Sequence, residues 1–402
     1  MLIVQKYGGT SMGDCERIHN VARRILKSKA QGHSLVVVVS AMSGDTDRLI
    51  GYTQHFTPLP NTREVDMVLS AGERVTAALL AIALESMGIK AISLSGRGAG
   101  VITDEFHTKA RISYIDTTKI FHLLNDGYVV VVAGFQGISQ QGEVTTLGRG
   151  GSDLSAVALA GALNASVCEI YSDVDGIYTT DPRIVKNARK LEKISYDEML
   201  ELASMGAKVL LNRSVELAKK LNVKLISASS FSDSTGTLIT KEEDIMEKPI
   251  VSGVALDKNQ ARVSLADVQD RPGIAADIFG LLADSQINVD MIVQTIGRDG
   301  KTDIDFTIPK TEVALTQQVL ERFKDDFGSI EYDNDIAKVS IVGVGMKSHS
   351  GVASTAFKAL AEDNINIMMI STSEIKISMI ISAEFAETAV NKLHSVYRLE
   401  IS

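Results

Sequence analysis

Residues Gly127-Tyr-Val-Val-Val-Val-Ala-Gly134 form a run rich in β-branched side chains. The run is too short to cross a membrane, but it has the length of a buried β-strand. Up to about residue 240, similar runs alternate with Ala- and Leu-rich stretches of helical period. This alternation is typical of a parallel sheet covered by helices. We therefore expect an α/β fold in which helices sandwich a mostly parallel sheet.

The expected strands are short and mostly rich in Val and Ile, and they span residues 2–6, 34–40, 91–94, 128–133, 169–172 and 224–227. The expected helices lie between them, at residues 16–29, 73–87, 152–163, 196–203 and 213–221. Glycine and polar clusters follow the strand ends, where an open parallel sheet places its ligands. We expect the functional side chains at these ends.

The composition is that of an ordinary globular protein with more than one domain. The chain has 402 residues, whereas a single domain usually has roughly 100 to 200. Its net charge of −9 opposes non-specific binding to nucleic acid or to an anionic membrane. Two cysteines, Cys15 and Cys168, are too few for a zinc site or a disulfide framework and fit a reducing compartment. The first residues lack the pattern of a signal peptide, so we expect a cytoplasmic enzyme.

The C-terminal part contains an internal repeat. A polar stretch at residues 240–249 is typical of a linker between domains. After it, the segment from Gly273 to Ile292 aligns without gaps on the segment from Gly351 to Ile370, a shift of 78 positions. Nine residue types coincide in register, including both glycines and the Ile-Asn pairs near the ends. The repeat predicts two copies of a small α+β unit of the βαββαβ kind.

The first polar cluster is Lys6-Tyr-Gly-Gly-Thr-Ser11, at the end of the first expected strand. Glycines without a Cβ let backbone amides approach an anion, and the lysine adds a mobile positive charge. The spacing is not that of a P-loop. An ordinary glycine turn after a strand is the alternative interpretation.

The second cluster is Thr145-Thr-Leu-Gly-Arg-Gly-Gly-Ser-Asp153, which opens an expected helix. Amides at a helix N-terminus favour negative charge, and Arg149 among three glycines would reach a carboxylate or a phosphate. In the alternative interpretation, Ser152 or Asp153 is simply a helix cap.

The third cluster, Tyr171-Ser-Asp-Val-Asp-Gly-Ile-Tyr-Thr-Thr-Asp-Pro-Arg183, is a strand end followed by a polar turn. Its acidic residues suit a metal ion or a nucleotide, and Arg183 would neutralise phosphate, but turn chemistry alone also explains the pattern. Two shorter segments are residues 40–47 after a strand and residues 70–74 before a helix. Each of these is also explained as a loop or a helix start.

Taken in chain order, these segments resemble the aspartokinase branch of the amino acid kinase family. The resemblance covers the whole chain through the motifs KYGGTS, SAMSG, SAGER, GFQG, TTLGRGGSD, DVDGIYTTDPR and MGAKVL, followed by two ACT-type repeats with INVDMI and ISTSEI. The sequence departs from many relatives at residues 211–214, which lack a histidine and a proline, and at Ala228, where a basic residue is common. The resemblance implies a catalytic domain at residues 1–245 and two ACT regulatory domains at residues 246–328 and 329–402.

The implied activity is transfer of the ATP γ-phosphate to the β-carboxylate of L-aspartate. It would give 4-phospho-L-aspartate at the start of lysine, threonine and methionine biosynthesis, with feedback inhibition by an end product. The acceptor carboxylate is already ionised at neutral pH, so no general base is needed. Lys6 would hold the transferring group, helped by Gly8, Gly9 and Mg²⁺ carried mainly by the nucleotide phosphates, and Asp153 would orient Lys6. The alternatives are a glutamate 5-kinase or acetylglutamate kinase type of enzyme, or a non-catalytic amino-acid sensor.

The resemblance also implies the binding residues. Arg149 would meet the α-carboxylate of aspartate and Glu73 its ammonium group, with Ser40, Thr46 and Ser152 as hydroxyl partners. The expected nucleotide residues are Ser172, Asp173, Tyr178, Arg183 and Lys208. No residue is expected to ligate a resident metal ion. Physics alone does not select aspartate over glutamate, because one methylene is worth only about 1 to 3 kcal/mol in a pocket.

The repeat suggests a regulatory site. In each copy a glycine-containing turn precedes a helix, at residues 270–275 and 349–353, and turn amides bind carboxylates. Asn288 and Asp290 in one copy, and Asn366 and Glu374 in the other, would hold an ammonium group. Ordinary turns and edge strands are the alternative. With the resemblance, an effector site between the copies is expected at Asp270, Ala275, Gln294, Asn366, Ile367 and Ser373. The effector would be lysine, threonine or both, and the ACT domains would join a homo-oligomer.

Overall fold

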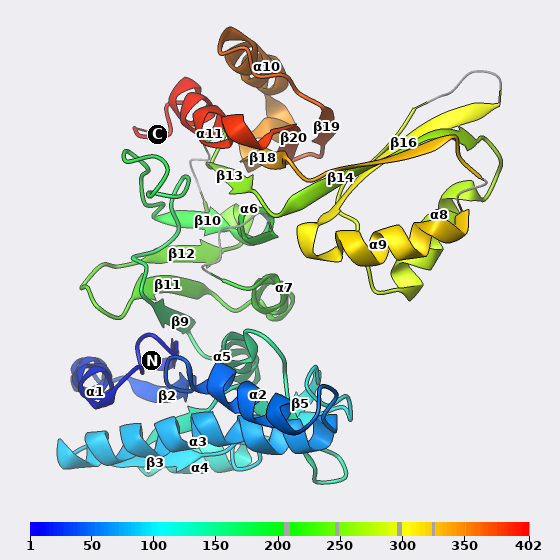
Figure 1. Ribbon diagram of the computed structural model, residues 1–402. Helices are drawn as coiled ribbons and strands as arrows, with labels where there is room; N and C mark the ends of the chain where they lie inside the picture. The colour runs from blue at the N-terminus through cyan, green and yellow to red at the C-terminus, as the bar shows by residue number, and fades with distance from the viewer. Residues whose placement is uncertain (205–209, 246–248, 296–299, 324–325, 350, 402) are drawn as a thin grey trace. The chain divides into compact units, whose positions relative to one another are not determined.

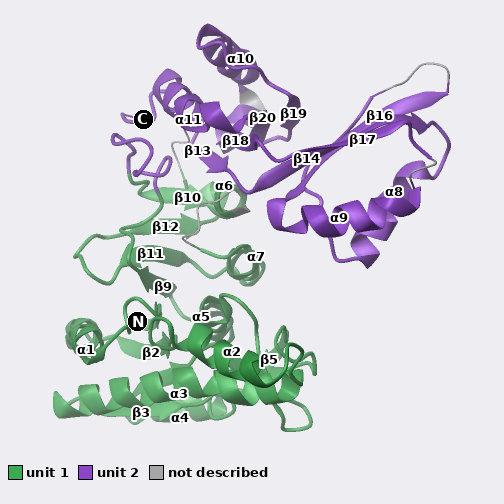
Figure 2. Cartoon of the chain, in the orientation of Figure 1, with its two compact units in different colours: residues 1–177, 190–203, 208–246 green, residues 178–189, 204–207, 247–402 purple. Residues whose placement is uncertain are grey.

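The computed structural model describes residues 1–402 apart from 205–209, 246–248, 296–299, 324–325, 350 and 402. The chain forms two compact units (Figure 2). The first contains residues 1–177, 190–203 and 208–246, and the second contains residues 178–189, 204–207 and 247–402.

The first unit is built on an eight-stranded sheet with the order β10-β12-β11-β9-β1-β2-β6-β3. Neighbouring strands are parallel except β11 and β12. The strands are β1 (Leu2–Tyr7), β2 (Ser34–Val39), β3 (Ala91–Leu94), β6 (Val129–Ala133), β9 (Val167–Ser172), β10 (Lys193–Ser195), β11 (Leu225–Ser229) and β12 (Thr237–Thr240). The mostly parallel sheet and all six expected strands are therefore confirmed.

A smaller sheet, with the order β5-β4-β7-β8, accompanies the large one. Its strands are β4 (Val101–Thr103), β5 (Ile112–Ile115), β7 (Gln136–Ser139) and β8 (Val144–Thr146). The helices of this unit are α1 (Cys15–Ala30), α2 (Asp45–Phe56), α3 (Thr62–Ser86), α4 (Thr118–Asn125), α5 (Gly151–Ala162), α6 (Tyr196–Ser204) and α7 (Asn212–Leu221), with the 3₁₀ turn η1 (Glu242–Asp244). The small sheet was not predicted.

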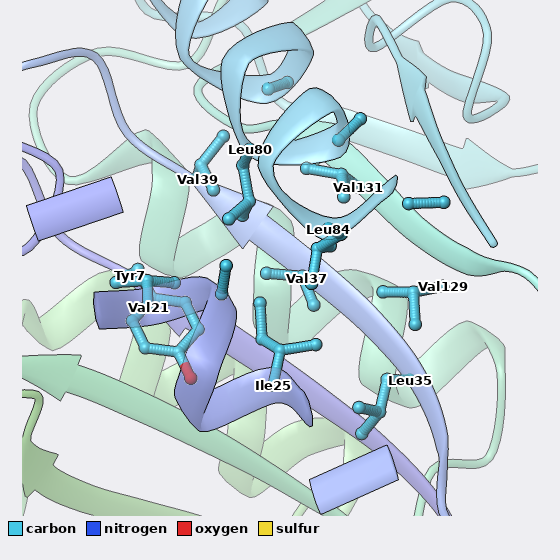
Figure 3. Close-up of a cluster of buried hydrophobic side chains, with 14 of the residues drawn as sticks. Tyr7, Val21, Ile25, Leu35, Val37, Val39, Leu80, Leu84, Val129 and Val131 are labelled. Atoms are coloured by element: carbon cyan, nitrogen blue, oxygen red, sulfur yellow. The ribbon is translucent and has the colours of Figure 1, made fainter. Parts of the chain in front are cut away.

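The core of the first unit is apolar on both faces of the sheet. Val37 and Val131 of the central strands are fully buried, as expected for a parallel sheet covered on both sides. Ile25 of α1 and Leu80 of α3 pack in the same cluster (Figure 3). By length and composition α3 is the one described helix that could cross a membrane, and half of its apolar window is buried inside the structure.

Helix α3 corrects one prediction. The sequence placed the segment at residues 70–74 before a helix that begins at residue 73, whereas α3 begins at Thr62 and contains the whole segment. Asn61 caps the helix by accepting a hydrogen bond from the backbone N–H of Arg63. Gly72 lies in the interior of α3, and a Cβ added there would lie 2.8 Å from the Cβ of Ala41. The glycine instead permits close approach of α3 to the loop after β2.

The second unit contains two four-stranded sheets. One has the order β15-β16-β14-β17 and the other β13-β18-β20-β19. The strands are β13 (Gly253–Asp257), β14 (Gln260–Gln269), β15 (Ile292–Gln294), β16 (Lys301–Pro309), β17 (Ser329–Asp333), β18 (Ile336–Val342), β19 (Met369–Thr372) and β20 (Lys376–Ser382). The helices are α8 (Ile274–Asp284), α9 (Val313–Leu320), α10 (Val352–Glu362) and α11 (Ala386–Val396), with 3₁₀ turns η2 (Lys310–Glu312), η3 (Glu321–Phe323), η4 (Val344–Ser348) and η5 (Ala383–Phe385).

The predicted repeat is confirmed in the second unit (Figure 1). Gly273 and Gly351 occupy equivalent N-cap positions with φ of +99° and +96°, a backbone conformation that favours glycine. The first copy runs β14-α8-β15-β16-α9-β17. In the second copy, β13 completes the sheet by pairing with β18, although it precedes the first copy in sequence. The two copies are thus interleaved in the chain.

Residues 178–189 belong to the second unit, although the sequence on either side belongs to the first. Val185 lies in one apolar cluster with Val254 and Val352. The hydroxyl of Thr179 lies 2.9 Å from Nε2 of the buried His394. The three-domain division with boundaries after residues 245 and 328 stays a prediction.

Candidate active site

The centre of the candidate site is an ion pair at the end of β1. Nζ of Lys6 lies 2.5 Å from Oδ1 of Asp153, which is in the first turn of α5. Both residues are buried, with exposed fractions of 9% and 7%. The same carboxylate oxygen makes no well-aligned hydrogen bond, so the contact is an ion pair alone. An ammonium group has three N–H donors, which leaves Lys6 able to meet a second anion.

A glycine turn lies directly beside this ammonium group. The N–H of Gly8 donates to the carbonyl of Tyr171 at 3.1 Å, which joins the ends of β1 and β9. A Cβ added to Gly8 would lie 3.3 Å from Nζ of Lys6, and one added to Gly9 would lie 3.2 Å from the carbonyl oxygen of Ala41. Side chains at these two positions would therefore crowd Lys6 and the loop after β2.

Glu73 presents a buried carboxylate from the middle of α3. Its Oε1 accepts a hydrogen bond from the N–H of Ala41 at 3.2 Å, and its Oε2 has no hydrogen-bond partner in the part of the chain that the structure describes. Burial raises the pKa of Glu73 to about 7, opposed by hydrogen bonds from backbone N–H groups, and the charge of Asp45 raises it further. A buried oxygen without a donor is an acceptor site for a ligand.

Two of the predicted hydroxyl partners, Ser40 and Thr46, follow the end of β2. Ser40 is half-buried directly before Ala41, and its N–H donates to the carbonyl of Tyr7 at 3.1 Å. Thr46 is half-buried in the first turn of α2. The structure therefore brings Ser40 next to the contact between Ala41 and Glu73.

Arg149 lies on a tight turn between β8 and α5. Gly148 and Gly150 have φ of +78° and +69°, and a Cβ on Gly150 would lie only 1.4 Å from Cδ1 of Leu211. The Arg149 side chain is exposed and has no hydrogen bond or ion pair to the residues that the structure describes. The two glycines and Leu211 fix the backbone of Arg149, and its guanidinium group is available to bind a ligand.

Neither Ser152 nor Asp153 caps α5. The N-cap is Gly150, which makes no side-chain cap. Ser152 is buried with its hydroxyl near the end of β6, where a Cβ added to Gly134 would lie 3.0 Å from it. The interpretation of this segment as mere helix capping is wrong.

Two of the predicted nucleotide residues, Ser172 and Asp173, lie at and directly after the end of β9 in the first unit. Ser172 ends β9, and its carbonyl accepts from the N–H of Ser230 at 2.9 Å. The hydroxyl of Ser230 in turn lies 2.7 Å from that of Ser11. Asp173 is exposed. Ser11 ends the first polar cluster and Ser230 follows the strand expected at residues 224–227, but neither was predicted as a site residue.

Two further predicted nucleotide residues are not part of the first unit. Tyr178 and Arg183 belong to the second unit, and Lys208 lies outside the described residues. The guanidinium group of Arg183 is 88% exposed and binds both carboxylate oxygens of Asp181. This hydrogen bonding lowers the pKa of Asp181 below its usual value. Within the described ranges, no three His, Cys, Asp or Glu residues are grouped as metal ligands.

A cavity of about 450 Å³ in the second unit contains two predicted effector residues, Ser373 and Glu374. It also contains the turn at the start of α10, and its complete lining is Met346, His349, Gly351, Val352, Ala353, Thr372, Ser373, Glu374 and Ile377. The turn amides and the acidic side chain thus share one cavity.

The remaining predicted effector residues lie outside this cavity. Asn366 is exposed and Ile367 is half-buried. In the first copy Asp270, Asn288 and Gln294 are exposed and Ala275 is half-buried. Asp290 already has a cationic partner, because its carboxylate pairs with the buried Lys338 of β18.

Family models match the N-terminal part of the chain and the two C-terminal repeats separately. Residues 1–227 match the amino acid kinase family, and residues 262–328 and 339–397 each match an ACT domain. The chain is 67% identical to a Helicobacter pylori (strain J99) aspartokinase over 404 aligned positions, covering 100% of both. It is also similar in structure to Escherichia coli aspartokinase III in complex with aspartate and ADP, with a TM-score of 0.82 and 26% identity over 98% of this chain and 99% of that one. The same enzyme in complex with lysine and aspartate gives a TM-score of 0.79 at 27% identity, with the same coverage.

Proposed function

Because the chain belongs to the aspartokinases of the amino acid kinase family, we propose that it transfers the γ-phosphate of ATP to the β-carboxylate of L-aspartate. The product would be 4-phospho-L-aspartate, the first intermediate of lysine, threonine and methionine biosynthesis in the cytoplasm. The observation that carries the proposal is the buried pair of Lys6 and Asp153 beside the Gly8–Gly9 turn.

Lys6 is the proposed catalytic cation. Phosphoryl transfer requires alignment of donor and acceptor and neutralisation of charge on the transferring group. The acceptor carboxylate is ionised at neutral pH, so Asp153 is not needed as a base and serves to orient the ammonium group of Lys6. Mg²⁺ bound mainly by the nucleotide phosphates would share the charge.

Arg149 and Glu73 are the proposed partners of the aspartate backbone groups. The free guanidinium group of Arg149 suits the α-carboxylate, and the unpartnered Oε2 of Glu73 suits the ammonium group. Ser40, Thr46 and Ser152 would add hydroxyl contacts. The E. coli enzyme solved with aspartate and ADP supports this choice of ligands.

The proposed nucleotide site begins at Gly8, Gly9, Ser172 and Asp173 in the first unit. The hydroxyl and amide groups at the ends of β1 and β9 suit phosphate oxygens. Tyr178, Arg183 and Lys208 remain proposed members of the site through the resemblance alone.

The second unit is the proposed regulatory part. Feedback inhibition by lysine, threonine or both would use the ACT repeat, and the E. coli enzyme solved with lysine supports an amino-acid effector. The cavity at Ser373 and Glu374 has a turn for a carboxylate and an acidic group for an ammonium group. The proposed site extends over Asp270, Ala275, Asn288, Asp290, Gln294, Asn366 and Ile367. Assembly into a homo-oligomer through the ACT domains is part of the same proposal.

A coupled assay of ADP release tests the proposed activity. The purified full-length protein is supplied with ATP and Mg²⁺ and with aspartate, glutamate or no acceptor. We expect release that depends on aspartate. Release with glutamate alone would indicate another kinase of the family, and no release with any acceptor would indicate a non-catalytic sensor.

A further inference from the structure

Asp66 is a fully buried carboxylate on α3 that no part of the proposed mechanism uses. Both its oxygens lie 3.1 Å from the backbone N–H of Thr108, which donates to them. The hydroxyl of Thr146 donates to Oδ1 at 2.5 Å, and Nδ1 of His107 lies 2.7 Å from Oδ2. Because a carboxylate only accepts, Nδ1 of His107 carries the proton. A single side chain thus satisfies three donors from two segments that are distant from it in sequence.

These hydrogen bonds connect α3 to the segment that leads into the Arg149 turn. Thr146 ends β8, three residues before Arg149. The carbonyl of Thr146 accepts from the N–H of Ala110 at 2.9 Å. On the other side, the guanidinium group of Arg213 donates to the carbonyls of Leu147 at 2.8 Å and of Ala110 at 2.9 Å. The backbone that enters the turn is therefore held from two sides.

Asp66 is placed to act on both aspartate-binding residues. It lies seven residues before Glu73 on the same helix, which is about two helical turns. Its bond to Thr146 fixes the strand that carries Arg149. We propose that Asp66 is a positioning residue that sets the separation of Glu73 and Arg149, and so the fit of the ammonium and α-carboxylate groups of aspartate. This inference rests on the proposed roles of Glu73 and Arg149.

A neutral amide does not replace the carboxylate. In Asp66→Asn one oxygen becomes an NH₂ group, which would face the N–H of Thr108 or the donors on Thr146 and His107. Buried donors without an acceptor are unfavourable, so the strand end is expected to shift. Displacement of a binding group by about 1 Å costs up to 100-fold in efficiency, and we expect about a tenfold rise in the aspartate KM with smaller changes in kcat and in the ATP KM.

Thr146→Val tests the same contact without changing Asp66. The substitution keeps the side-chain volume but removes the hydroxyl donor, and we expect the same selective rise in the aspartate KM. Thr146→Ser keeps the hydroxyl and should restore values close to wild type. This pair of variants keeps the test open if Asp66→Asn does not fold.

Glu198→Gln is the matched control for lost stability. Glu198 is buried in the same unit, and its Oε2 accepts a hydrogen bond from the hydroxyl of Ser195 at 2.6 Å. Ser195 belongs to β10, which is the edge strand of the large sheet and is separated by other strands from those that carry the site. It should lower the melting temperature and leave the aspartate KM unchanged. If Asp66 is a positioning residue, Asp66→Asn raises the aspartate KM, whereas a similar loss of melting temperature in Glu198→Gln does not.

The double variant Asp66→Asn/Arg149→Ala decides whether Asp66 acts through Arg149. If it does, Asp66→Asn has little further effect on the aspartate KM once Arg149 is gone. Fully additive effects, or an aspartate KM within about twofold of wild type in both Asp66→Asn and Thr146→Val, would overturn the proposal. If instead the proposed role of Arg149 is wrong, Arg149→Ala alone would leave the aspartate KM unchanged.

Discussion

The ammonium group of Lys6 and the carboxylate of Asp153 lie 2.5 Å apart, and their side chains are only 11% and 10% exposed. A buried charged group needs a partner of opposite charge, and each of these two side chains provides that partner for the other. The pair joins the end of β1 to the first turn of α5 and fixes the lysine beside the Gly8 turn.

Lys6→Met should lower kcat about 100-fold or more while nucleotide affinity changes little, because the ammonium group acts mainly in the transition state. Steady-state kinetics and calorimetric titration with ADP measure the two quantities. The double variant Lys6→Met/Asp153→Asn is the control, since it avoids an unpaired buried carboxylate. Near-normal turnover in Lys6→Met would show that another group carries the catalysis.

Arg149→Ala should raise the aspartate KM by tenfold or more and leave the ATP KM close to wild type. A hydrogen bond to a charged group contributes about 1.5 to 3 kcal/mol, and this contact is already present in the ground state. Saturation curves for both substrates provide the check. If aspartate saturates the variant as it does the wild type, Arg149 contacts phosphate instead.

Glu73 predicts the pH dependence of aspartate binding. With a pKa of about 7, Glu73 is largely protonated at pH 6 and ionised at pH 8. Only the ionised form pairs with the ammonium group, so the aspartate KM should fall as pH rises through 7. Glu73→Gln should raise the KM and remove this dependence. A wild-type KM that is flat between pH 6 and pH 8 would exclude the role.

The same carboxylate predicts a pH effect on stability without ligand. The folded-state pKa of Glu73 is raised above the ordinary value of 4.5, so the folded state favours the protonated form. Its contribution is fully present below pH 4.5 and is lost as pH rises through 7. The melting temperature of the wild type relative to Glu73→Gln should therefore fall between pH 5 and pH 8. A constant difference across this range would contradict the raised pKa.

Ser373→Phe should abolish inhibition by lysine or threonine and leave uninhibited activity largely intact, because a bulky ring would fill the cavity at the start of α10. A tenfold loss of activity requires only about 1.4 kcal/mol of differential effector affinity between active and inactive states. Ser395→Phe, at an exposed position of α11, is the matched control. If Ser373→Phe and Gln294→Ala are both still inhibited at wild-type effector concentrations, the effector site lies elsewhere.

The strands of the large sheet could be predicted because each one is marked by residues that are neighbours in sequence. The valines of β2 and β6 are continuous apolar runs bounded by turns, and the structure buries them. The pairing of Lys6 with Asp153 was predicted through the family resemblance, and the structure places the two side chains in contact.

The features that the sequence did not predict depend on contacts between residues far apart in the chain. Strand β13 pairs with β18 across the whole first copy of the repeat, and no periodicity encodes that choice. Val185 follows a polar motif that begins in the first unit, but it is buried in the core of the second. Asp66 belongs to no motif, and only the folded chain shows its three donors.

Trapping the product with hydroxylamine tests most directly whether the β-carboxylate of aspartate receives the phosphoryl group. Hydroxylamine converts an acyl phosphate to a hydroxamate and marks the carboxyl group that was activated. With ATP, Mg²⁺ and aspartate, we predict aspartate β-hydroxamate in amounts equal to the ADP released. Formation of the α-hydroxamate, or ADP release without any hydroxamate, would contradict the proposed reaction.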